Sequence, residues 1–491
     1  MLPKHDDLPL ETGAQEHSGR PTIPARGIQF SIAKRRILLI QGDMAVTLLS
    51  VLCALWLWAL TAQEPFTLAF IWERVVWFFV LPLLWLTLAH ANDYYNLRVT
   101  SRFSSSVTRL AWISLQLVLA YGIIFLLAPR NLLPRAFILY YAILSLTMIA
   151  LWRAGRLFLT SRSSFRRRVL IVGTGSASQA IWEAIKQEVQ HDYEIVGCVT
   201  SAHDRTPAVE GAALLGTGKE LVKLVQQYGV SELIVSYVND VPNDIFQGLM
   251  ACYRQGIAIV PMPMLYEQIT GRIPIELVDQ HLWALVLPHE ERSLVFNLSQ
   301  ALKRGIDLLL ALVGLALFAL CFPLLALAIK LDSPGPIFYL QERVGRGDKV
   351  FKIVKLRSMI DGAENLTGVR WATDHDTRVT RLGRLMRKVR LDEVPQLINV
   401  LAGEMSLVGP RPERPEFVQL LGSEIPFYQT RHVVKPGLTG WAQIRYRYGN
   451  STEDALRKLQ YDLYYIRHQS LIFDLTILAR TIITIIKFQG T

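Results

Sequence analysis

The run Lys303–Lys330, KRGIDLLLALVGLALFALCFPLLALAIK, decides the fold of this chain. Its uncharged part, Leu308–Ile329, is close to the ~20 residues with which an α-helix crosses ~30 Å of hydrocarbon. Basic residues flank the run on both sides, and such residues favour the cytoplasmic face of a membrane. Pro323, near the middle, removes a backbone N–H and breaks or kinks a helix. We therefore predict a re-entrant helix, which enters the membrane and returns to the same face.

The composition indicates an integral membrane protein with several folding units. The 491 residues are too many for one core, 51% of them are hydrophobic, and the mean hydropathy is +0.28. The net charge of +11 gathers beside apolar blocks, where anionic headgroups attract Lys and Arg, so we expect a lipid bilayer and no nucleic acid as partner. The four cysteines lie far apart in the sequence, which favours reduced, structural thiols over disulfides or a metal cluster.

Four further apolar stretches precede this run, at 37–61, 70–90, 108–128 and 134–152. Each is near the length of a membrane span, so we predict a four-helix transmembrane domain at 31–160 behind a disordered polar tail at 1–30. Basic residues before the first stretch and after the fourth place both ends of this domain in the cytoplasm. Asp43 lies inside the first stretch, and we expect it to snorkel or to pair with Arg or Lys. One buried charge does not suggest a channel or transporter.

Residues 166–290 show the pattern of a Rossmann-like cytoplasmic domain. Short apolar runs alternate with helical stretches, as in a parallel sheet covered by helices. Gly173 and Gly175, in the sequence GTGSAS, resemble a dinucleotide fingerprint whose glycines let backbone N–H groups approach a phosphate. The third glycine is replaced by Ser178, and no acidic residue ends the next strand. Nucleotide binding through Gly173 and Gly175 and a purely structural turn both stay open.

The last part of the chain, 300–491, carries many polar motifs. In chain order they are SPGP (333–336), QERVG (341–345), KLRSM (355–359), RLDEVPQL (390–397), GEMSL (403–407), GPRPE (409–413) and KPGLTGWAQ (435–443). Two adjacent carboxylates, Asp392 and Glu393, among guanidinium groups beside a membrane suit chemistry on a polyanion. One carboxylate can attack phosphorus, while the other binds Mg²⁺. Arg411, between two prolines, suits a stiff phosphate-binding fork.

Each motif alone has an ordinary explanation. An Asp-Glu pair is usually a solvated helix start or an ion pair, and a GPRP stretch is a stiff loop. The chain also lacks a Walker lysine loop, which disfavours a nucleoside-triphosphate enzyme. Only the combination of the motifs supports a catalytic interpretation.

In this order, the motifs closely resemble the bacterial sugar transferase family, the polyprenyl-phosphate hexose-1-phosphate transferases. The resemblance covers 302–491, and the upstream spans with the Rossmann-like domain resemble the long-form members. It implies a mostly α, monotopic catalytic domain with a re-entrant membrane helix at 300–491. It also implies a multi-pass protein of the bacterial inner (cytoplasmic) membrane whose catalytic domain lies on the cytoplasmic face.

The resemblance further implies the reaction. Hexose-1-phosphate, with glucose or galactose as the expected sugar, passes from a UDP-hexose to undecaprenyl phosphate with release of UMP, which begins exopolysaccharide, capsule or O-antigen repeat units. Asp392 would be the nucleophile that forms an aspartyl-phosphosugar, and Glu393 would bind Mg²⁺. The residues implied to grip phosphates are Lys355, Arg357 and Arg411, with Arg343 and Arg390 as further candidates. Val394 and Arg445–Gly449 depart from the common family pattern, which leaves the contacts to sugar and nucleotide open.

Two other functions compete with this one. A membrane-bound nucleotide-sugar oxidoreductase or epimerase would need an intact dinucleotide site and a base such as a Tyr-x-x-x-Lys pair, and no such pair stands out in 166–290. A regulator of polysaccharide assembly would suit the first 290 residues.

The run 470–487 is predicted to be an interfacial helix. The oligomeric state stays open, with a homodimer as the candidate.

Overall fold

A computed structural model describes most of the chain from residue 32 to residue 486. The described ranges are 32–92, 94–95, 103–127, 137–160, 166–190, 192–202, 209–237, 240–277, 294–362, 376–446, 449 and 451–486. The tail predicted at 1–30 lies outside them.

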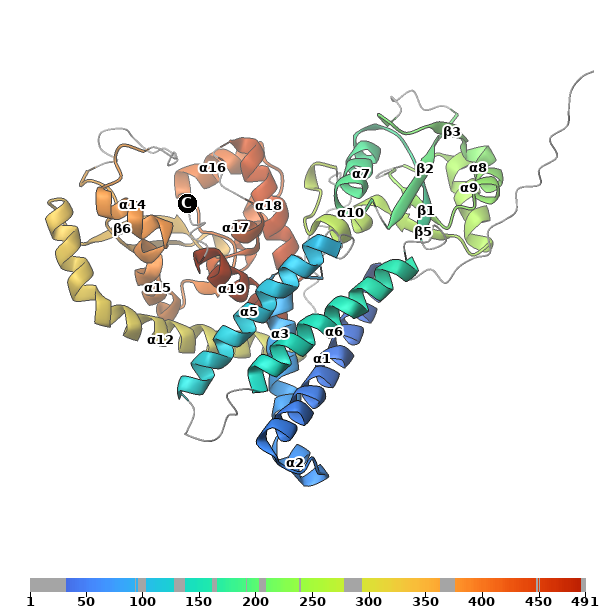
Figure 1. The fold of residues 1–491 in the computed structure, drawn as a ribbon. Coiled ribbons are helices and arrows are strands. Elements are labelled where there is room, and N and C mark those ends of the chain that lie inside the picture. The colour runs from blue at the N-terminus through green and yellow to red at the C-terminus, as the bar shows by residue number, and fades with distance from the viewer. Residues whose placement is uncertain are drawn as a thin grey trace, which may run out of the picture.

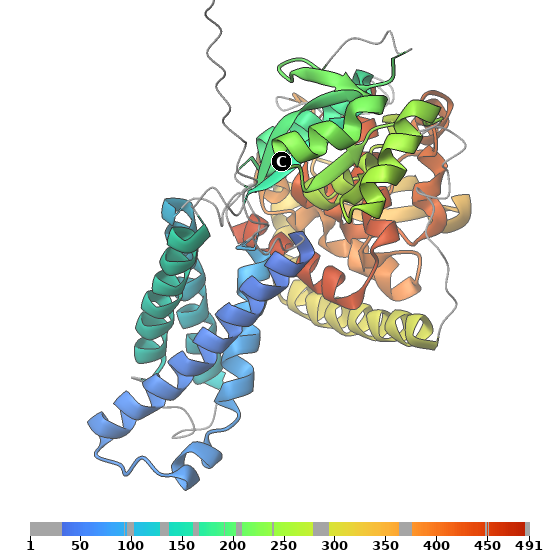
Figure 2. The same ribbon diagram turned by 90° about the vertical axis from the view of Figure 1, so that its right-hand side faces the viewer.

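Four long helices of the N-terminal part pack side by side. They are α1 (Ile32–Ala62), α3 (Trp77–Ala91), α5 (Phe103–Leu127) and α6 (Phe137–Thr160), and the short α2 (Leu68–Glu73) lies between the first two. Helices α1 and α5 each contact both α3 and α6. Figure 2 shows this bundle projecting from the rest of the chain. Leu55 is buried between helices, whereas Leu60 and Leu151 are 57% and 72% exposed, so the bundle is apolar outside as well as inside, as lipid contact requires.

The predicted stretch 70–90 is divided in the structure. Helix α2 ends at Glu73, and α3 begins at Trp77. Arg74 follows the end of α2, where its Nη1 donates to the carbonyl of Phe70 (3.1 Å) and its guanidinium lies 4.0 Å from the centre of the Phe70 ring. This cation ends the first helix because it binds one of the carbonyls that a helix C-terminus leaves without an intrahelical partner.

Asp43 forms a buried ion pair with a residue of the fourth long helix. Arg153 Nη2 and Nε lie 2.5 and 3.3 Å from the two carboxylate oxygens of Asp43, and both residues are at most 1% exposed. The Arg153 guanidinium also lies 4.4 Å from the centre of the Tyr94 ring. The expected pairing with Arg or Lys is confirmed, and the snorkelling alternative is wrong because the partner reaches Asp43 inside the bundle.

The middle part is a five-stranded parallel sheet with helices on both faces. In chain order its elements are β1 (Arg167–Val172), α7 (Gly175–Glu188), β2 (Tyr193–Thr200), β3 (Leu214–Thr217), α8 (Leu221–Tyr228), β4 (Glu232–Val235), α9 (Asn243–Arg254), β5 (Ala258–Pro261) and α10 (Met262–Thr270). The strand order is β3-β2-β1-β4-β5. Figure 1 shows α7 and α10 on one face and α8 and α9 on the other. The predicted Rossmann-like sheet is confirmed.

Alternating side chains of β1 build the two cores of this unit. Val169 and Ile171 pack with α7 and α10, whereas Leu170 and Val172 pack with α8 and α9. All four side chains are fully buried. A strand that is buried on both faces has a continuous apolar sequence, which agrees with the predicted alternation of short apolar runs and helical stretches.

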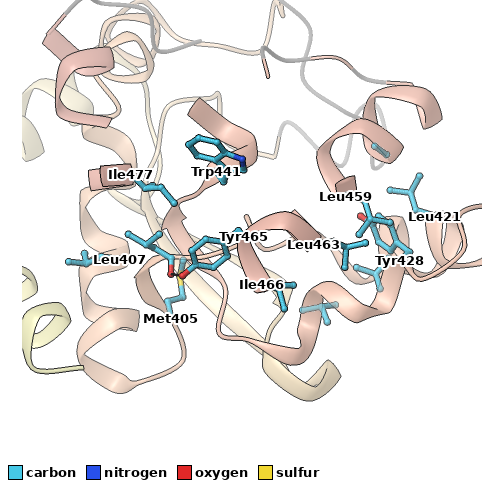
Figure 3. Packing of buried hydrophobic residues seen from close by; sticks show 14 of the residues in the cluster. Met405, Leu407, Leu421, Tyr428, Trp441, Leu459, Leu463, Tyr465, Ile466 and Ile477 are labelled. Carbon is cyan, nitrogen blue, oxygen red and sulfur yellow. Dashed lines mark hydrogen bonds between the residues drawn. The ribbon is translucent and has the colours of Figure 1, made fainter. Parts of the chain in front are cut away.

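The C-terminal part is helical apart from a hairpin and a short strand pair. Its elements are α12 (Leu294–Asp332), β6 (Phe338–Val344), β7 (Val350–Leu356), α14 (Arg381–Lys388), the 3₁₀ helix η6 (Leu391–Gln396), α15 (Leu397–Ala402), β8 (Ser406–Val408), α16 (Pro415–Glu424), η7 (Tyr428–Val433), β9 (Gly437–Thr439), α17 (Trp441–Arg445), α18 (Thr452–Arg467) and α19 (Leu471–Ile486). Figure 3 shows Tyr465 beside Leu407, and Leu459 beside Tyr428. Helix α18 thus supplies the centre of one continuous core.

Helix α12 is continuous through Pro323, and both of its ends are bound to the same domain. Near its start, Arg304 donates to the carbonyls of Val400 (2.7 Å) and Leu401 (3.0 Å). Near its end, the carboxylate of Asp332 accepts from the backbone N–H of Leu382 (3.1 Å). Figure 1 shows α12 running beneath the domain and then turning up along its side. A proline is the usual cause of such a bend.

By length and composition, three helices among the described residues could cross a membrane. They are Leu38–Ala62, Phe137–Gly155 and Asn297–Asp332, and Trp77–Ala89 is a shorter apolar helix. In the third of these, Leu320 and Leu324 are 77% and 74% exposed. The chain is therefore a membrane protein with apolar helices, as predicted.

The middle and C-terminal parts touch through the end of α10. The carbonyl of Gly271 accepts from Trp441 Nε1 (3.0 Å), and the buried Glu267 accepts from His468 (2.7 Å) and Arg467 (3.2 Å). The tryptophan of the KPGLTGWAQ motif therefore lies at the joint between two parts of the chain.

Candidate active site

The predicted dyad lies on a 3₁₀ turn that the chain enters through a strained residue. Arg390 has a positive φ of 55°, which reverses the chain between α14 and η6. Pro395 fixes the next turn of backbone. Asp392 and Glu393 are only 6% and 8% exposed, and the turn packs against β7, which carries Lys355. Two buried carboxylates are therefore held at the end of a β-strand that carries a cation.

Glu393 is surrounded by three cations. Arg411 reaches its two oxygens with Nη2 (2.5 Å) and Nη1 (3.3 Å). Lys355 Nζ lies 3.5 Å from one oxygen, and Arg390 Nη1 lies 3.6 Å from the other. Counting the adjacent Asp392, the structure thus brings together five of the predicted site residues. Burial alone would raise the pKa of Glu393, but Arg411 and Lys355 outweigh burial and hold it far below its usual range.

Asp392 differs from its neighbour because it has no hydrogen bond or ion pair among the described residues. Burial raises the pKa of Asp392, and the Glu393 carboxylate raises it further, whereas Lys355, Arg387 and Arg411 act in the opposite direction. A carboxylate with a raised pKa and no partner is a better nucleophile than one bound by arginine. The two members of the dyad therefore have different chemical capacities.

Lys355 is the cation whose charge is most easily changed. Burial lowers its pKa to about 8, although the neighbouring Glu393 carboxylate favours the charged form. Its ammonium group therefore loses its proton in a range that an assay can reach.

Arg411 is positioned by a buried arginine, Arg431, and a half-buried one, Arg343, which bind successive carbonyls of the GPRPE loop. Arg343 Nη1 donates to the carbonyl of Pro412 (3.0 Å), and Arg431 Nη2 donates to the carbonyl of Arg411 (3.0 Å). Arg431 also binds Asp462 (2.8 Å), which is 1% exposed. These two bonds hold the backbone of the loop, and the loop in turn holds the Arg411 guanidinium at Glu393.

Sequence reasoning missed three residues of this site: Arg387, Arg431 and Asp462. Arg387 acts electrostatically on Asp392 and donates to Ser358 Oγ (3.1 Å). Its place in the basic run Arg384–Arg390, directly before the dyad, could have indicated it. Nothing in the sequence near Arg431 or Asp462 marks them, because their partners lie in other elements.

The predicted phosphate-binding residues Arg357 and Arg343 face backbone carbonyls instead of the dyad. Arg357 Nη2 donates to Ser333 (2.6 Å) and Ile329 (3.3 Å), at the end of α12. Arg357 thereby holds the SPGP turn, as Arg343 holds the GPRPE loop. A phosphate role for either residue stays a prediction.

Gly173 and Gly175 lie at the predicted turn between β1 and α7. Their φ angles are 127° and 81°, which favour glycine. The turn belongs to the middle part of the chain, so it is separate from the dyad and its cations.

The dyad fits a Mg²⁺ ion that is held mainly by a substrate. Among the residues that the structure describes, no three His, Cys, Asp or Glu side chains gather as a metal site. Mg²⁺ is commonly bound by one or two carboxylates together with substrate phosphates, and Asp392 and Glu393 supply two. Both oxygens of Glu393 contact cations, so a metal bound by this carboxylate would share its oxygens with them or replace one of them.

Comparison with known proteins matches two segments of the chain to family models. Residues 298–488 match the model described as "Bacterial sugar transferase", and residues 90–260 match the one described as "CoA-binding domain". The first match contains every residue of the dyad and its cations.

Three relatives illustrate the similarity over longer ranges. The chain is 41% identical over 242 residues to the UDP-N-acetylgalactosamine-undecaprenyl-phosphate N-acetylgalactosaminephosphotransferase of Aeromonas hydrophila (49% of this chain, 55% of the relative). It is 33% identical to the undecaprenyl-phosphate glucose phosphotransferase of Komagataeibacter xylinus (64% and 58%). It is 31% identical to the UDP-glucose:undecaprenyl-phosphate glucose-1-phosphate transferase of Escherichia coli K12 (70% and 73%). The chain thus spans a little over half the length of the first two relatives.

Proposed function

Because this chain belongs to the bacterial sugar transferase family, in its long form, we propose that it transfers hexose-1-phosphate from a UDP-hexose to undecaprenyl phosphate and so begins a polysaccharide repeat unit. The observation that carries the proposal is the difference between the two members of the dyad. Among the described residues the buried Asp392 side chain has no hydrogen-bond or ion-pair partner, and Glu393 beside it is bound by three cations. A nucleophile next to an electrostatic clamp is what phosphoryl chemistry requires.

Asp392 carries out the covalent step in this proposal. Its carboxylate oxygen attacks the phosphorus that bears the sugar, the bond from that phosphorus to the UMP oxygen breaks, and UMP leaves with the electron pair. A phosphate oxygen of undecaprenyl phosphate then attacks the same phosphorus. The Asp392–phosphorus bond breaks, which releases the lipid diphosphosugar and restores the carboxylate.

The cations on Glu393 move to the substrate. Lys355, Arg390 and Arg411 all contact Glu393, and the diphosphate of a UDP-hexose carries more negative charge than one carboxylate. In our proposal, the diphosphate therefore takes over Arg411 and Lys355, and Glu393 becomes free to bind Mg²⁺ as the sequence predicts. The metal, when bound, supplies charge neutralisation at the phosphoryl oxygens. Glu393 holds the cations in place until then.

The membrane arrangement is also part of the proposal. From Arg304 to Ile329 a straight helix would extend about 38 Å, enough to cross a bilayer, yet residues near both ends bind one domain. This supports a re-entrant α12. In our proposal, residues 31–160 form a four-span bundle whose basic flanks place the Rossmann-like domain at 166–290 on the cytoplasmic side. The catalytic domain at 300–491 then faces the cytoplasm. Cysteines placed before 303 and after 340 should label from the same face, and labelling from opposite faces would contradict this arrangement.

UMP release tests the chemistry. Membranes with Mg²⁺, undecaprenyl phosphate and a UDP-hexose should release UMP, and Asp392→Asn should abolish the release. Asp240→Asn, at an exposed aspartate of the middle part, is the matched control and should stay active. Undiminished UMP release by Asp392→Asn would remove the nucleophile assignment.

The same assay identifies the sugar that is transferred. The relatives named for N-acetylgalactosamine and for glucose both resemble this chain. A panel of UDP-glucose, UDP-galactose and UDP-N-acetylgalactosamine therefore covers the expected donors. We propose glucose or galactose, and a clear preference for the N-acetylated sugar would contradict that choice.

A further inference from the structure

Three cations from separate segments of the C-terminal part lie close together beside Gly403. Gly403 follows α15 with a φ of 85°, and a Cβ placed on it would lie 3.5 Å from Arg304 Nη2 and 3.6 Å from Lys435 Nζ. Arg346, in the turn between β6 and β7, acts electrostatically on Lys435 together with Arg304. We call Arg304, Arg346 and Lys435 the basic cluster. The cations that contact Glu393 are different residues.

The positive charge of the basic cluster is not balanced by its surroundings. In the described part of the chain, the half-buried Lys435 has no hydrogen-bond or ion-pair partner for its ammonium group. Burial and the two arginines lower the pKa of Lys435, whereas the Asp307 carboxylate acts in the opposite direction. The oxygens of Asp307 already accept from β8 (2.8 and 3.1 Å), and Glu404, next to Gly403, accepts from Asn399 (2.8 Å). An added anion would therefore relieve repulsion within the cluster.

The three cations are held in place before any ligand arrives. Two bonds to carbonyls of α15 (2.7 and 3.0 Å) use two of the five N–H groups of Arg304. The turn that carries Arg346 is bound to η7, because Asp348 Oδ1 lies 2.6 Å from His432 Nδ1. Lys435 comes two residues before β9, which pairs with β8. An anion that binds here therefore has little backbone to order.

The basic cluster lies beside the start of the apolar run of α12. Leu309 and Leu312 in that run are 61% and 57% exposed, as lipid contact requires. A helix rises about 1.5 Å per residue, so Arg304 lies about 8 Å along the axis from Leu309. This length is comparable to one headgroup layer of a bilayer, which is roughly 5–8 Å thick. When these leucines contact hydrocarbon, the cluster is at the depth of the lipid headgroups.

We propose that the basic cluster binds the phosphate of an anionic phospholipid headgroup, such as that of phosphatidylglycerol. Its depth favours a lipid phosphate over a free phosphate ion. A zwitterionic lipid carries an ammonium group beside its phosphate, which three cations would repel, so the net charge of the cluster selects the anionic lipid. The bound lipid anchors the start of α12 to one leaflet. The proposal rests on the contact of α12 with the membrane and not on the transferase activity.

Lipid retention by the full-length chain tests the proposal. The chain is reconstituted in vesicles of equal parts phosphatidylglycerol and phosphatidylcholine, without undecaprenyl phosphate, extracted in detergent and measured by native mass spectrometry. We expect phosphatidylglycerol to be retained in preference to phosphatidylcholine. Lys435→Ala and Arg346→Ala should each lower the retained phosphatidylglycerol about fivefold, the factor expected when one cation beside an anionic lipid is removed. Lys435→Arg keeps the charge and should keep the lipid.

Lys330→Ala is the matched control for this measurement. Lys330 is an exposed cation at the other end of the same apolar run, so the variant removes the same charge beside the membrane. It should retain phosphatidylglycerol as the unaltered chain does. Equal losses in Lys330→Ala and Lys435→Ala would show a general attraction to anionic membranes, and equal retention of the two lipids by the unaltered chain would show no selection. Either result would overturn the proposal.

The unfolding temperature distinguishes lipid binding from a structural role of Lys435. In phosphatidylcholine alone, Lys435→Ala should unfold no more easily than the unaltered chain, because it removes a cation that two neighbours repel. Phosphatidylglycerol should raise the unfolding temperature of the unaltered chain more than that of Lys435→Ala, and inorganic phosphate should raise neither. Destabilisation of Lys435→Ala in phosphatidylcholine alone, or an equal rise with inorganic phosphate, would contradict the lipid site.

Discussion

Asp462→Ala should damage both the stability of the C-terminal part and the active site. The Asp462 carboxylate lies 2.8 Å from Arg431 Nη2, and both residues are buried, with exposed fractions of 1% and 6%. Removing it leaves a buried guanidinium without a counter-charge, which costs about 3–5 kcal/mol. Asp462→Asn keeps an oxygen acceptor, so we expect a loss of about 1–3 kcal/mol.

The effect on activity follows from the second bond of Arg431. The same Nη2 donates to the carbonyl of Arg411, whose guanidinium makes two contacts with Glu393. A charge-assisted hydrogen bond contributes about 1.5–3 kcal/mol. If the freed loop loses one such bond, UMP release should fall about 10- to 100-fold.

Thermal unfolding and UMP release at saturating UDP-hexose measure the two effects separately. Glu453→Ala is the control on the same helix, because its side chain is 72% exposed and its ion pair with Arg457 (2.8 Å) should contribute under about 1 kcal/mol. If Asp462→Ala unfolds and releases UMP as Glu453→Ala does, the Arg431 link does not position Arg411 and the reasoning is wrong.

Three other predictions follow from named contacts. Burial lowers the pKa of Lys355 to about 8, so kcat/KM for UDP-hexose should fall as the pH rises through 8, and Lys355→Arg should move this alkaline limb upward; a pH profile that is the same in both forms would contradict it. Asp43→Ala should destabilise the helical bundle by about 3–5 kcal/mol because Arg153 stays buried without its carboxylate partner, and the double variant Asp43→Leu with Arg153→Met should recover most of this in detergent unfolding curves; a double variant no better than the single one argues against the pair. Trp441→Phe leaves the Gly271 carbonyl without its donor and should lower the unfolding temperature by an amount equivalent to about 1–3 kcal/mol, whereas an unchanged unfolding temperature would show that this joint adds little.

Local patterns in the sequence were enough for the elements. The apolar run Leu308–Ile329 predicts the helix α12, and the short apolar run at 169–172 predicts a strand of a parallel sheet, because run length and side-chain periodicity report burial directly. The division of the stretch 70–90 into two helices is not predicted by hydropathy, because a hydropathy average hides the single residue Arg74. In the structure, α2 ends at that residue. The type of an element can therefore be predicted where many residues favour the same structure. The end of an element cannot be predicted where a single cation determines it.

The roles of individual cations were less accessible. Arg343, Arg357 and Arg411 all follow from motifs, yet the first two bind backbone carbonyls and only the third binds Glu393. Asp244 illustrates the converse. It lies at the end of β2 but belongs to α9, so the sequence of the strand does not reveal it. A motif identifies a residue type and a segment, but it does not say which acceptor the side chain will face.

The sequence by itself determined that the chain has apolar helices, a parallel sheet and a basic C-terminal part with adjacent carboxylates, because composition, run length and spacing are local properties. Only the tertiary structure decided that Glu393 binds three cations while Asp392 has no partner in the described part of the chain, and that both ends of α12 contact one domain. Those facts depend on contacts such as Arg411 with Glu393 or Arg304 with Val400, between segments 18 and 96 residues apart. Such contacts form only when the whole core has packed. Burial then makes the interaction between two charges stronger than it is between two solvated side chains.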